Sequence, residues 1–588
     1  MSGVLAGVNL HYVNTVDKAM EFKRWLGERR NVLGVDTETG GFSPERNRLR
    51  LVQFGDLGSG WAIPWEMWGG VAMEALTGYD DPMVLHNSKF DVRFITRKIG
   101  WEWPWHRTHD TMNLAHLDNP LRAKGLKPLA GMLVDPQAVS AQRLLDDAMT
   151  KNKWTWDTVP IDFPYYWVYA AMDPVLTCHI FEYLQPALNE HRYVYDLEMG
   201  VTRVIAKMEA TGAHVDLAYS EMKQRQLVEW ANVARDWLLT TFRGQGLTGL
   251  TDMKLLKFFQ DNEVPMLDKM TKSGSRQALD KEVLDSIDHQ VAEYILAIRK
   301  AEKMAGTYFK NFLEMADDEG YLHPNIWTMG TRTARMSVTD PALQTLPRDD
   351  PTVRTAFIPR DEHHVLITCD YDQVEARLMA HFSEDPGLIA AFNDTSRDFF
   401  CTVASTIFQD TIVNKKDKRR QVTKNAFYGK LYGAGAAKMA VTAKVPLEQM
   451  VAVDQGMNAR FPGIVMMQRR INALAQGRAK ADGTPWITTP YGRKLVADDR
   501  KEYTLTNYLI QSHAGELFKR KLVDLDTVLP PEVRIVLPVH DELVFDVPRE
   551  MAGEVRQLIE ETMSDSTYRV PITCSSDLLE SNWGDKYR

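Results

Sequence analysis

The alternation of apolar and polar positions divides the chain into a mixed α/β first third and a helix-rich continuation. Three short apolar runs predict strands, at 32–36, 48–56 and 83–87. A helical pattern follows the third run, and an irregular Trp- and Pro-rich segment precedes a further helix near residue 165. From about residue 193, apolar residues recur at spacings of three and four, which predicts helices to residue 320. We therefore expect a domain boundary near residue 190.

Two apolar segments of the second half have carboxylates at their ends. Residues 365–371 are β-branched and apolar, which predicts a buried strand. Residues 533–547 predict two strands around a tight acidic turn, and residues 415–440 predict a basic helix followed by a glycine-containing break. The fold class expected from these elements is α/β (α+β), and 588 residues suffice for more than one domain.

Composition narrows the class of protein without identifying it. Hydrophobic residues make up 44% of the chain, an ordinary value for a globular protein with sizeable cores. The formal net charge of −9 argues against a general nucleic-acid coat, but it permits a DNA enzyme with a local basic groove. The four cysteines form no CxxC pair, which favours a reducing cytoplasm over a zinc or disulfide framework. Because no apolar run reaches about 18 residues, we expect no membrane span.

Two carboxylates end the first predicted strand. Asp36 and Glu38 lie two positions apart in DTETGG, so their side chains point to the same face. Carboxylates held that close repel each other when ionised, and a divalent cation relieves the repulsion. Taken alone, the pair favours a solvated strand end.

Further motifs change that interpretation. Asp91 lies at the start of a predicted helix in HNSKFDVRF, and Tyr169 and Asp173 lie one helical turn apart in YAAMD. Tyr169 alone would be typical of a packing residue, but beside Asp173 its hydroxyl is suited to orienting a water. For Asp110, in HDTMNLA, we predict a structural hydrogen-bonding role.

These motifs, with GLKPLA at 125–130, resemble the DEDD 3′→5′ exonucleases of the subtype with a tyrosine in its third motif. The resemblance covers about residues 25–185. It implies an RNase H-like exonuclease domain that trims a single-stranded DNA 3′ end, with Tyr169 as a catalytic residue. It also implies two bound metal ions, with the ligands Asp36, Glu38, Asp91 and Asp173.

A second pair of carboxylates lies at the ends of the later strands. Asp370 follows the buried strand in DYDQVEAR, and Asp541 lies in the turn of PVHDELVF. A lone aspartate at position 370 would most often cap a helix. On adjacent strands of one sheet, the two carboxylates would instead form a second two-metal site. Glu542 is equally typical of a site residue and of a hairpin surface.

One face of the predicted helix in KRRQVTKNAFYGKLYGAG (418–435) begins with cations and ends with aromatic rings. Steps of four residues turn a helix by about 400°, so residues spaced by four share a face. Cations suit phosphates and rings suit a sugar and base, which together describe a nucleoside triphosphate. The residues on this face are Arg420, Lys424, Tyr428 and Tyr432. For the basic run alone, a solvated face is the alternative.

These three segments resemble motifs A, B and C of the DNA polymerase I family, also called family A. The resemblance implies a right-hand polymerase in which Asp370, Asp541 and the carbonyl of Tyr371 bind two Mg²⁺, with Mn²⁺ able to substitute. It implies that Arg420 and Lys424 contact the triphosphate, and Lys424 is also a candidate catalytic residue.

Other family positions are implied in the same way. Tyr428 would admit dideoxynucleotides, Tyr432 would stack near the templating base, and Glu375 would exclude a ribose 2′ hydroxyl. The alternative for Glu375 is a surface pair with a basic residue. The segment TRTARMSVTDPALQTLP resembles a further family motif, through which Arg335 would reach the primer terminus. Asn507 and Gln511 fit positions that contact the template.

The resemblance also predicts the domains: an exonuclease at 1–190 and a polymerase at 191–588. Within the polymerase we expect a thumb, a palm and fingers, at about 195–325, 326–400 with 490–588, and 401–489. The length leaves no room for an N-terminal 5′ nuclease domain, which favours a bacteriophage replicase over a bacterial repair enzyme. Several positions depart from the family pattern without removing a metal ligand. They include Ala334, Phe400, Tyr503 and Pro538, and the segment PALQT at 341–345.

The sequence thus predicts a template-directed DNA polymerase that proofreads and binds primer–template DNA and dNTPs. We expect a monomer, in the cytoplasm of a bacterial host if the protein is phage-encoded. We recognise no signal for a processivity factor or helicase. Three alternatives stay open: a nuclease with a DNA-binding scaffold, a non-catalytic accessory protein, and a polymerase with an inactive exonuclease.

Overall fold

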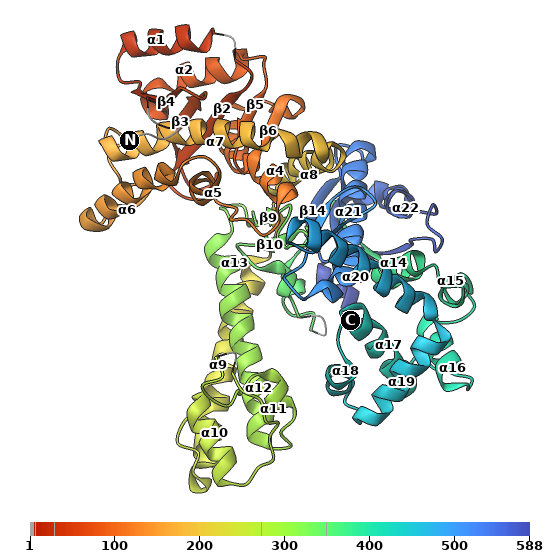
Figure 1. The fold of residues 1–588 in the computed structure, drawn as a ribbon. Helices are drawn as coiled ribbons and strands as arrows, with labels where there is room; N and C mark the ends of the chain where they lie inside the picture. Colours follow the sequence, from red (N-terminus) through yellow and green to blue (C-terminus); the bar gives the residue numbers. More distant parts are fainter. Residues whose placement is uncertain (1–4, 6, 29, 272, 348–349, 588) are drawn as a thin grey trace.

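The computed structural model describes residues 5, 7–28, 30–271, 273–347 and 350–587. Figure 1 shows a sheet-containing unit at the N-terminus, a long helical stalk and a larger body that includes the C-terminus. None of the helices in the described part of the chain combines the length and the apolar character that a membrane crossing needs.

A six-stranded sheet organises the N-terminal unit. Its order is β1-β4-β3-β2-β5-β6, in which β3 runs antiparallel to both β2 and β4 and the other neighbours are parallel. The strands are β1 Asn9–Tyr12, β2 Leu33–Thr39, β3 Leu49–Gly55, β4 Ser59–Pro64, β5 Met83–Leu85 and β6 Thr108–Asp110. The three strands predicted from the sequence are confirmed as β2, β3 and β5.

Helices cover both faces of this sheet. α1 and α2 share an apolar core with one face, and α7 contacts β2, β3 and β4 on the other. The helices of the unit are α1 Val16–Leu26, α2 Trp65–Gly78, α3 Ser88–Ile99, α4 Thr111–Asp118, α5 Leu126–Leu133, α6 Ser140–Asn152 and α7 Pro164–Glu190. The predicted boundary near residue 190 coincides with the end of α7.

Glycines allow α7 to lie close to the sheet. A Cβ atom at Gly34 would lie 2.3 Å from the carbonyl oxygen of Pro174, and one at Gly60 would lie 1.9 Å from that of Ala171. Both distances are far below van der Waals contact, so a larger residue would displace the helix. The glycines therefore bring Asp173, on α7, close to the strands.

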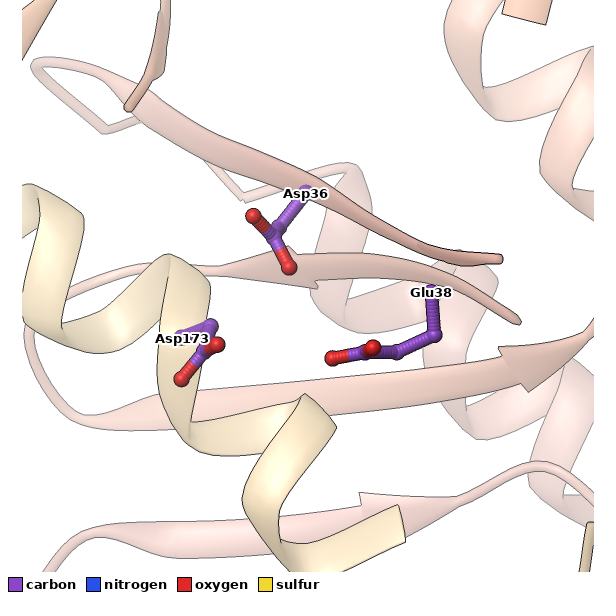
Figure 2. Close-up of side chains that lie close together, drawn as sticks. All are labelled: Asp36, Glu38 and Asp173. Carbon is purple, nitrogen blue, oxygen red and sulfur yellow. The ribbon is translucent and has the colours of Figure 1, made fainter. Parts of the chain in front are cut away.

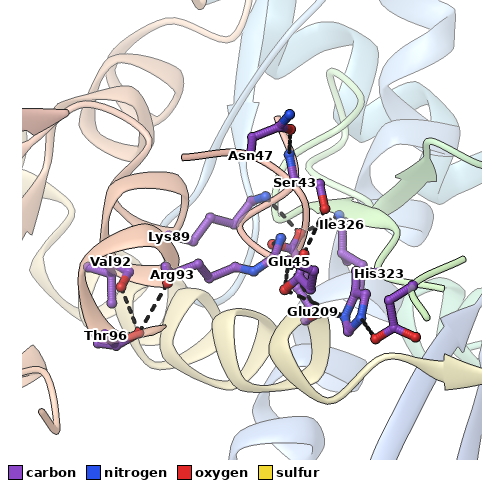
Figure 3. Close-up of polar contacts among 11 residues, drawn as sticks. Ser43, Glu45, Asn47, Lys89, Val92, Arg93, Thr96, Glu209, His323 and Ile326 are labelled. Carbon is purple, nitrogen blue, oxygen red and sulfur yellow. Dashed lines mark hydrogen bonds and ion pairs between the residues drawn. The ribbon is translucent and has the colours of Figure 1, made fainter. Parts of the chain in front are cut away.

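The helix α8 (Arg192–Thr211) joins the N-terminal unit to the body. It contacts α3 on one side, and α21 (Leu505–Val528) and β14 (Arg534–Val539) on the other. At its end, the buried carboxylate of Glu209 accepts hydrogen bonds from the side chains of Lys89 and Arg93 on α3. It also accepts one from the backbone N–H of Ile326 (Figure 3). The two parts are thus joined through buried ion pairs.

The stalk follows α8 and has its own apolar core at its far end. α9 (Leu217–Thr241) packs along α12 (Gln290–Lys303), which continues through a π-helical turn, Met304–Phe309, into α13 (Lys310–Met315). α10 (Asp252–Asp261) and α11 (Lys281–Asp285) complete the tip. The region predicted as helical, 195–320, is therefore divided between the body, which receives α8, and the stalk.

A four-stranded antiparallel sheet lies at the centre of the body, in the order β14-β15-β11-β16. The remaining strands of this sheet are β11 His364–Tyr371, β15 Glu542–Pro548 and β16 Cys574–Leu579. α22 (Ala552–Met563) packs on β11 and β16. The predicted buried strand and the predicted hairpin are both confirmed, as β11 and as β14 with β15.

A helical lobe lies between β11 and β14 in the chain. Its helices are α14 Val374–Ser383, α15 Pro386–Asn393, α16 Phe399–Phe408, α17 Lys418–Leu431, α18 Ala436–Ala443, α19 Leu447–Arg460 and α20 Pro462–Asp482. Short strand pairs link the parts: β7 Ala213–His214 with β8 Tyr321–Leu322, β9 Asn325–Trp327 with β10 Ser337–Thr339, and β12 Trp486–Thr488 with β13 Lys494–Val496. The predicted basic helix is α17, and the glycine-containing break separates it from α18.

Candidate active sites

Three carboxylates converge over the N-terminal sheet (Figure 2). β2 presents Asp36 and Glu38 on one face, as the alternation of the strand predicts, and α7 places Asp173 over that face. One carboxylate oxygen from each residue lies within 4.8 Å of the others. This arrangement suits carboxylates that share a metal cation.

The electrostatics of this cluster favour a bound cation. Burial raises the pKa of Asp36 to about 7. The pKa of Glu38 is raised well above its usual value, first by burial and then by the charge of Asp36. Ionising all three carboxylates without a counter-charge is therefore costly, because the charges are desolvated and repel each other.

Asp91 and Tyr169 lie beside the cluster. Asp91 is buried on α3 and accepts a hydrogen bond of 2.6 Å from the hydroxyl of Thr37. Burial and then the charge of Asp36 raise its pKa, although it is outside the set of three oxygen atoms within 4.8 Å. Burial and the neighbouring Glu38 keep the pKa of Tyr169 well above its usual value, so its hydroxyl stays a donor at neutral pH.

Lys127 is a member of this site that we did not predict. It is buried on α5, forms an ion pair with Asp173, and lies 4.1 Å from the ring centroid of Tyr169. Burial lowers its pKa to about 7, against the opposing effects of Asp36 and Glu38. The sequence signal was GLKPLA, which we used for the resemblance without assigning its lysine.

Asp110 has the structural role predicted for it. Its carboxylate accepts hydrogen bonds from the backbone N–H and the hydroxyl of Ser88, at 2.7 and 2.8 Å. It also caps α4 by accepting from the backbone N–H of Met112. These bonds hold the start of α3, the helix that carries Asp91.

The second acidic pair lies on the body sheet. Asp370 is the penultimate residue of β11 and is paired in register with Glu542 of β15, and Asp541 lies in the turn before β15. The backbone N–H of Tyr371 donates to the carbonyl of Asp541 at 3.4 Å, which joins the two segments directly. Burial raises the pKa of Asp370 to about 6, and the neighbouring Glu542 and Asp541 add to the shift.

Glu542 is buried and is not part of a hairpin surface, so that alternative was wrong. It accepts a hydrogen bond of 3.0 Å from Lys586, a residue near the C-terminus that the sequence did not suggest. Lys586 opposes the rise in the pKa of Asp370.

A cavity of about 750 Å³ opens beside these carboxylates. It brings together residues from distant parts of the chain. Those that the sequence singled out are Arg335, Asp370, Tyr371, Glu375, Lys424, Tyr428, Tyr432, Asp541 and Glu542. Arg420, Asn507 and Gln511 are not among its lining residues.

Arg420 is engaged elsewhere. Its guanidinium makes two hydrogen bonds to the carboxylate of Asp398, at 2.7 and 2.9 Å. This interaction lowers the pKa of Asp398 to about 2, although partial burial opposes the shift. Lys424, one turn later on α17, lies on the cavity, and its ammonium is 5.8 Å from the ring centroid of Phe400.

Glu375 links two segments across the cavity. It forms an ion pair with Arg335 and accepts a hydrogen bond of 2.8 Å from the hydroxyl of Tyr432. Glu375 is buried, so the alternative of a surface pair was wrong, although its partner is a basic residue. Ala334, beside Arg335, has a φ of +56°, a conformation that favours glycine.

Asn507 and Gln511 lie one turn apart on α21. Asn507 is buried, and its Nδ2 has no hydrogen-bond partner among the described residues. The two residues lie outside the cavity lining.

Comparison with known proteins decides the family. Residues 252–585, more than half of the chain, match the profile described as DNA polymerase family A. The chain belongs to DNA polymerase family A. Residues 12–189 of this family A polymerase also match a profile described as 3′-5′ exonuclease. The protein is therefore a DNA polymerase with a 3′→5′ exonuclease domain, as the sequence motifs predicted.

Two phage polymerases are similar to this family A polymerase over nearly its whole length. The DNA polymerases of Mycobacterium phages D29 and L5 are each 28% identical, over 99% of this chain and 97% of theirs. DNA polymerase I of Helicobacter pylori strain J99 is 29% identical, over 66% of this chain and 44% of its own length. A solved structure described as the POL domain of Pol1 from M. smegmatis, in complex with DNA primer-template and dNTP, has a TM-score of 0.77. It covers 98% of this chain at 24% identity, so it supports the fold alone.

Proposed function

We propose that the body cavity extends a DNA primer along a template, with Asp370, Asp541 and the Tyr371 carbonyl holding two Mg²⁺. The observation that carries this proposal is the meeting of the two aspartates with Lys424 and Tyr428 on one cavity. The pair fits a cation because Asp370 is desolvated beside other carboxylates. Bound Mg²⁺ would assist the in-line displacement by lowering the pKa of the primer hydroxyl and neutralising the triphosphate.

The chain's own groups then bind and orient the nucleotide. Lys424 binds the phosphates and acts in catalysis, while Tyr428 faces the sugar and Tyr432 faces the base. Glu375, fixed by Arg335 and Tyr432, excludes a ribose 2′ hydroxyl. Glu542, held by Lys586, adjusts the charge of the site.

Arg420 contacts the triphosphate after its guanidinium is released from Asp398. Its guanidinium makes two hydrogen bonds to Asp398, and at least one of them must be released when a triphosphate binds. Arg335 contacts the primer terminus in the minor groove, and Asn507 and Gln511 contact the template strand.

We assign the exonuclease reaction to the cluster on the N-terminal sheet. Asp36, Glu38, Asp91 and Asp173 hold two Mg²⁺, which Mn²⁺ replaces, and Tyr169 orients the attacking water. The convergence of three carboxylates supports this assignment. Asp91 is included because it accepts a hydrogen bond from Thr37, the residue next to Asp36. The substrate is a single-stranded DNA 3′ end.

The domain assignment follows the parts of the fold. We keep the exonuclease at 1–190 and the polymerase at 191–588, with fingers at about 401–489 and the palm at 326–400 and 490–588. The contacts of α8 with the body support a thumb that begins at α9 rather than at residue 195. The phage relatives support a role in phage genome replication. We infer that the protein acts as a monomer in a bacterial cytoplasm and binds primer–template DNA and dNTPs.

Primer extension on a primed template, with and without a mismatched 3′ end, tests both sites at once. Asp541→Asn should reduce extension by at least about 100-fold and leave removal of the mismatch intact. Asp36→Asn should show the reverse pattern. Extension by Asp541→Asn at the parental rate would refute the polymerase site, and mismatch removal by Asp36→Asn would refute the exonuclease site.

A further inference from the structure

Gln53 lies in the middle of the exonuclease sheet, directly opposite Asp36. β2 and β3 pair antiparallel, with Asp36 opposite Gln53 and Glu38 opposite Leu51. Directly opposed residues project to the same face of a sheet, with Cβ atoms about 4.5–5.5 Å apart. Gln53 therefore points to the face on which the carboxylates of Asp36, Glu38 and Asp173 meet.

The helix that carries Asp173 covers this face. On one side of Gln53, a Cβ atom at Gly55 would lie 3.1 Å from the ring of Pro174. On the other side, Leu51 shares an apolar cluster with Ala170 of the same helix. The carboxamide is therefore enclosed between the strands and the turn of α7 that ends at Asp173.

The carboxamide itself is unpartnered. Gln53 is 0% exposed, and neither its Oε1 nor its Nε2 has a hydrogen-bond partner among the described residues. Burying an amide without hydrogen bonds is destabilising, whereas an apolar side chain of similar volume would fill the same space without that cost. Stability alone would therefore favour leucine or methionine at this position.

We propose that Gln53 is a positioning residue of the exonuclease site: its Nε2, unpartnered within the described part of the chain, donates a hydrogen bond to the carboxylate of Asp36 when the site holds its cations. This inference rests on the exonuclease site proposed above. The bond fixes the rotation of the Asp36 carboxylate and thereby the oxygen that faces the cations. A neutral amide is suited to this task because it adds neither a further negative charge nor a cation that competes with the metal.

The test is Gln53→Met in the full chain, which removes both polar atoms at similar volume. We expect the rate of digestion of a single-stranded oligonucleotide to fall by about 10–100-fold, as for other residues that orient metal ligands. Primer extension should stay within twofold. The Tm in EDTA should be equal or higher, and the rise in Tm on adding Mg²⁺ should be smaller than in the parent.

Two further variants at this face separate positioning from packing. Leu51→Met alters the apolar neighbour without touching a polar group, so its exonuclease rate should stay close to that of the parent. Gln53→Glu keeps the shape but places a carboxylate opposite Asp36, and it should lose at least as much activity as Gln53→Met. A packing role predicts the opposite order.

Each outcome bears on a definite claim. Parental exonuclease activity in Gln53→Met overturns the inference, and so does a loss that Leu51→Met shares together with a lower Tm in EDTA. Asp36→Asn is the control for the site itself. If Asp36→Asn keeps its activity, the proposed exonuclease site is wrong. If Asp36→Asn is inactive and Gln53→Met is not, only the inference about Gln53 fails.

Discussion

The substitution Glu209→Gln tests whether the two enzymatic units are held together by buried charge. The glutamine keeps an oxygen for the backbone N–H of Ile326, which the carboxylate accepts at 2.6 Å. It removes the charge that faces Lys89 at 2.7 Å and Arg93 at 3.0 Å. Both cations come from α3, the helix that also carries Asp91.

The expected magnitude follows from the burial of the charges. Lys89 is 5% exposed and Arg93 is 9% exposed, so neither cation is well hydrated. Removing one partner of a buried ion pair costs about 3–5 kcal/mol, because the other charge is left uncompensated. Glu45 lies 3.2 Å from Arg93, and Asn325 accepts from Lys89 at 2.6 Å. Because these partners remain, we expect the lower end of that range, about 3 kcal/mol.

Native-state hydrogen exchange is the appropriate assay, because a chain of several units does not unfold in one step. The backbone amides of α3 report the local opening directly. A loss of about 3 kcal/mol should speed their exchange by about 150-fold.

Two comparisons complete this test. Adding Lys89→Met to Glu209→Gln should recover part of the protection, because it removes one of the stranded charges. Glu21→Gln breaks a pair of similar length with Lys18 on the surface of α1, and it should leave exchange unchanged. If Glu209→Gln speeds the exchange of α3 less than about threefold, water reaches the two cations and the reasoning from desolvation is refuted.

Three further predictions concern the two sites. Ala334→Gly should raise the free energy of local opening around residue 334 by about 1 kcal/mol, because Ala334 has a φ of +56°. Native-state hydrogen exchange that is not slowed in the neighbouring residues would contradict this strain. Lys127→Met should lower the Tm in EDTA at pH 6, where a pKa of about 7 keeps the lysine charged, because the carboxylates lose their counter-charge. It should also enlarge the rise in Tm on adding Mg²⁺, and an unchanged Tm would exclude that role. The pKa of Asp36 is raised to about 7 and that of Asp370 to about 6, so the folded state binds more protons than the unfolded state between about pH 4 and those values. The contribution of these two groups to stability in EDTA should therefore fall as the pH rises through that window, and the stabilisation by Mg²⁺ should grow. A stabilisation by Mg²⁺ that is equal at pH 5 and pH 8 would argue against this linkage.

The parts of the sites that depend on local spacing were predictable from the sequence. Asp36 and Glu38 share a face because a strand alternates, and Lys424 and Tyr428 share a face because a helix repeats. The apolar run before Asp370 predicts the strand that carries it. The two apolar runs on either side of Asp541 predict the hairpin. In each case the geometry is fixed within a few residues.

The contacts that close over long distances in the chain were not predictable in this way. Lys127 reaches Asp173, Arg420 is held by Asp398, and Lys586 reaches Glu542 only after separate elements have packed together. No periodicity encodes such pairs, since each depends on the relative placement of two elements. The buried ion pairs of Glu209 are a further case, because by composition alone a glutamate on an amphipathic helix predicts a solvated side chain.

The stalk has a mechanical consequence. Its long helices α9 and α12 lie side by side: α9 leads away from the body, and α12 leads back toward it. The π-helical turn Met304–Phe309 follows α12, near the base of the stalk. At 1.5 Å per residue, the 25 residues of α9 give a lever of about 37 Å. A tilt of about 10° at the base would therefore carry the tip through about 6 Å, roughly one helical turn. A small rearrangement of packing at the base of the stalk would thus produce a large displacement of its tip.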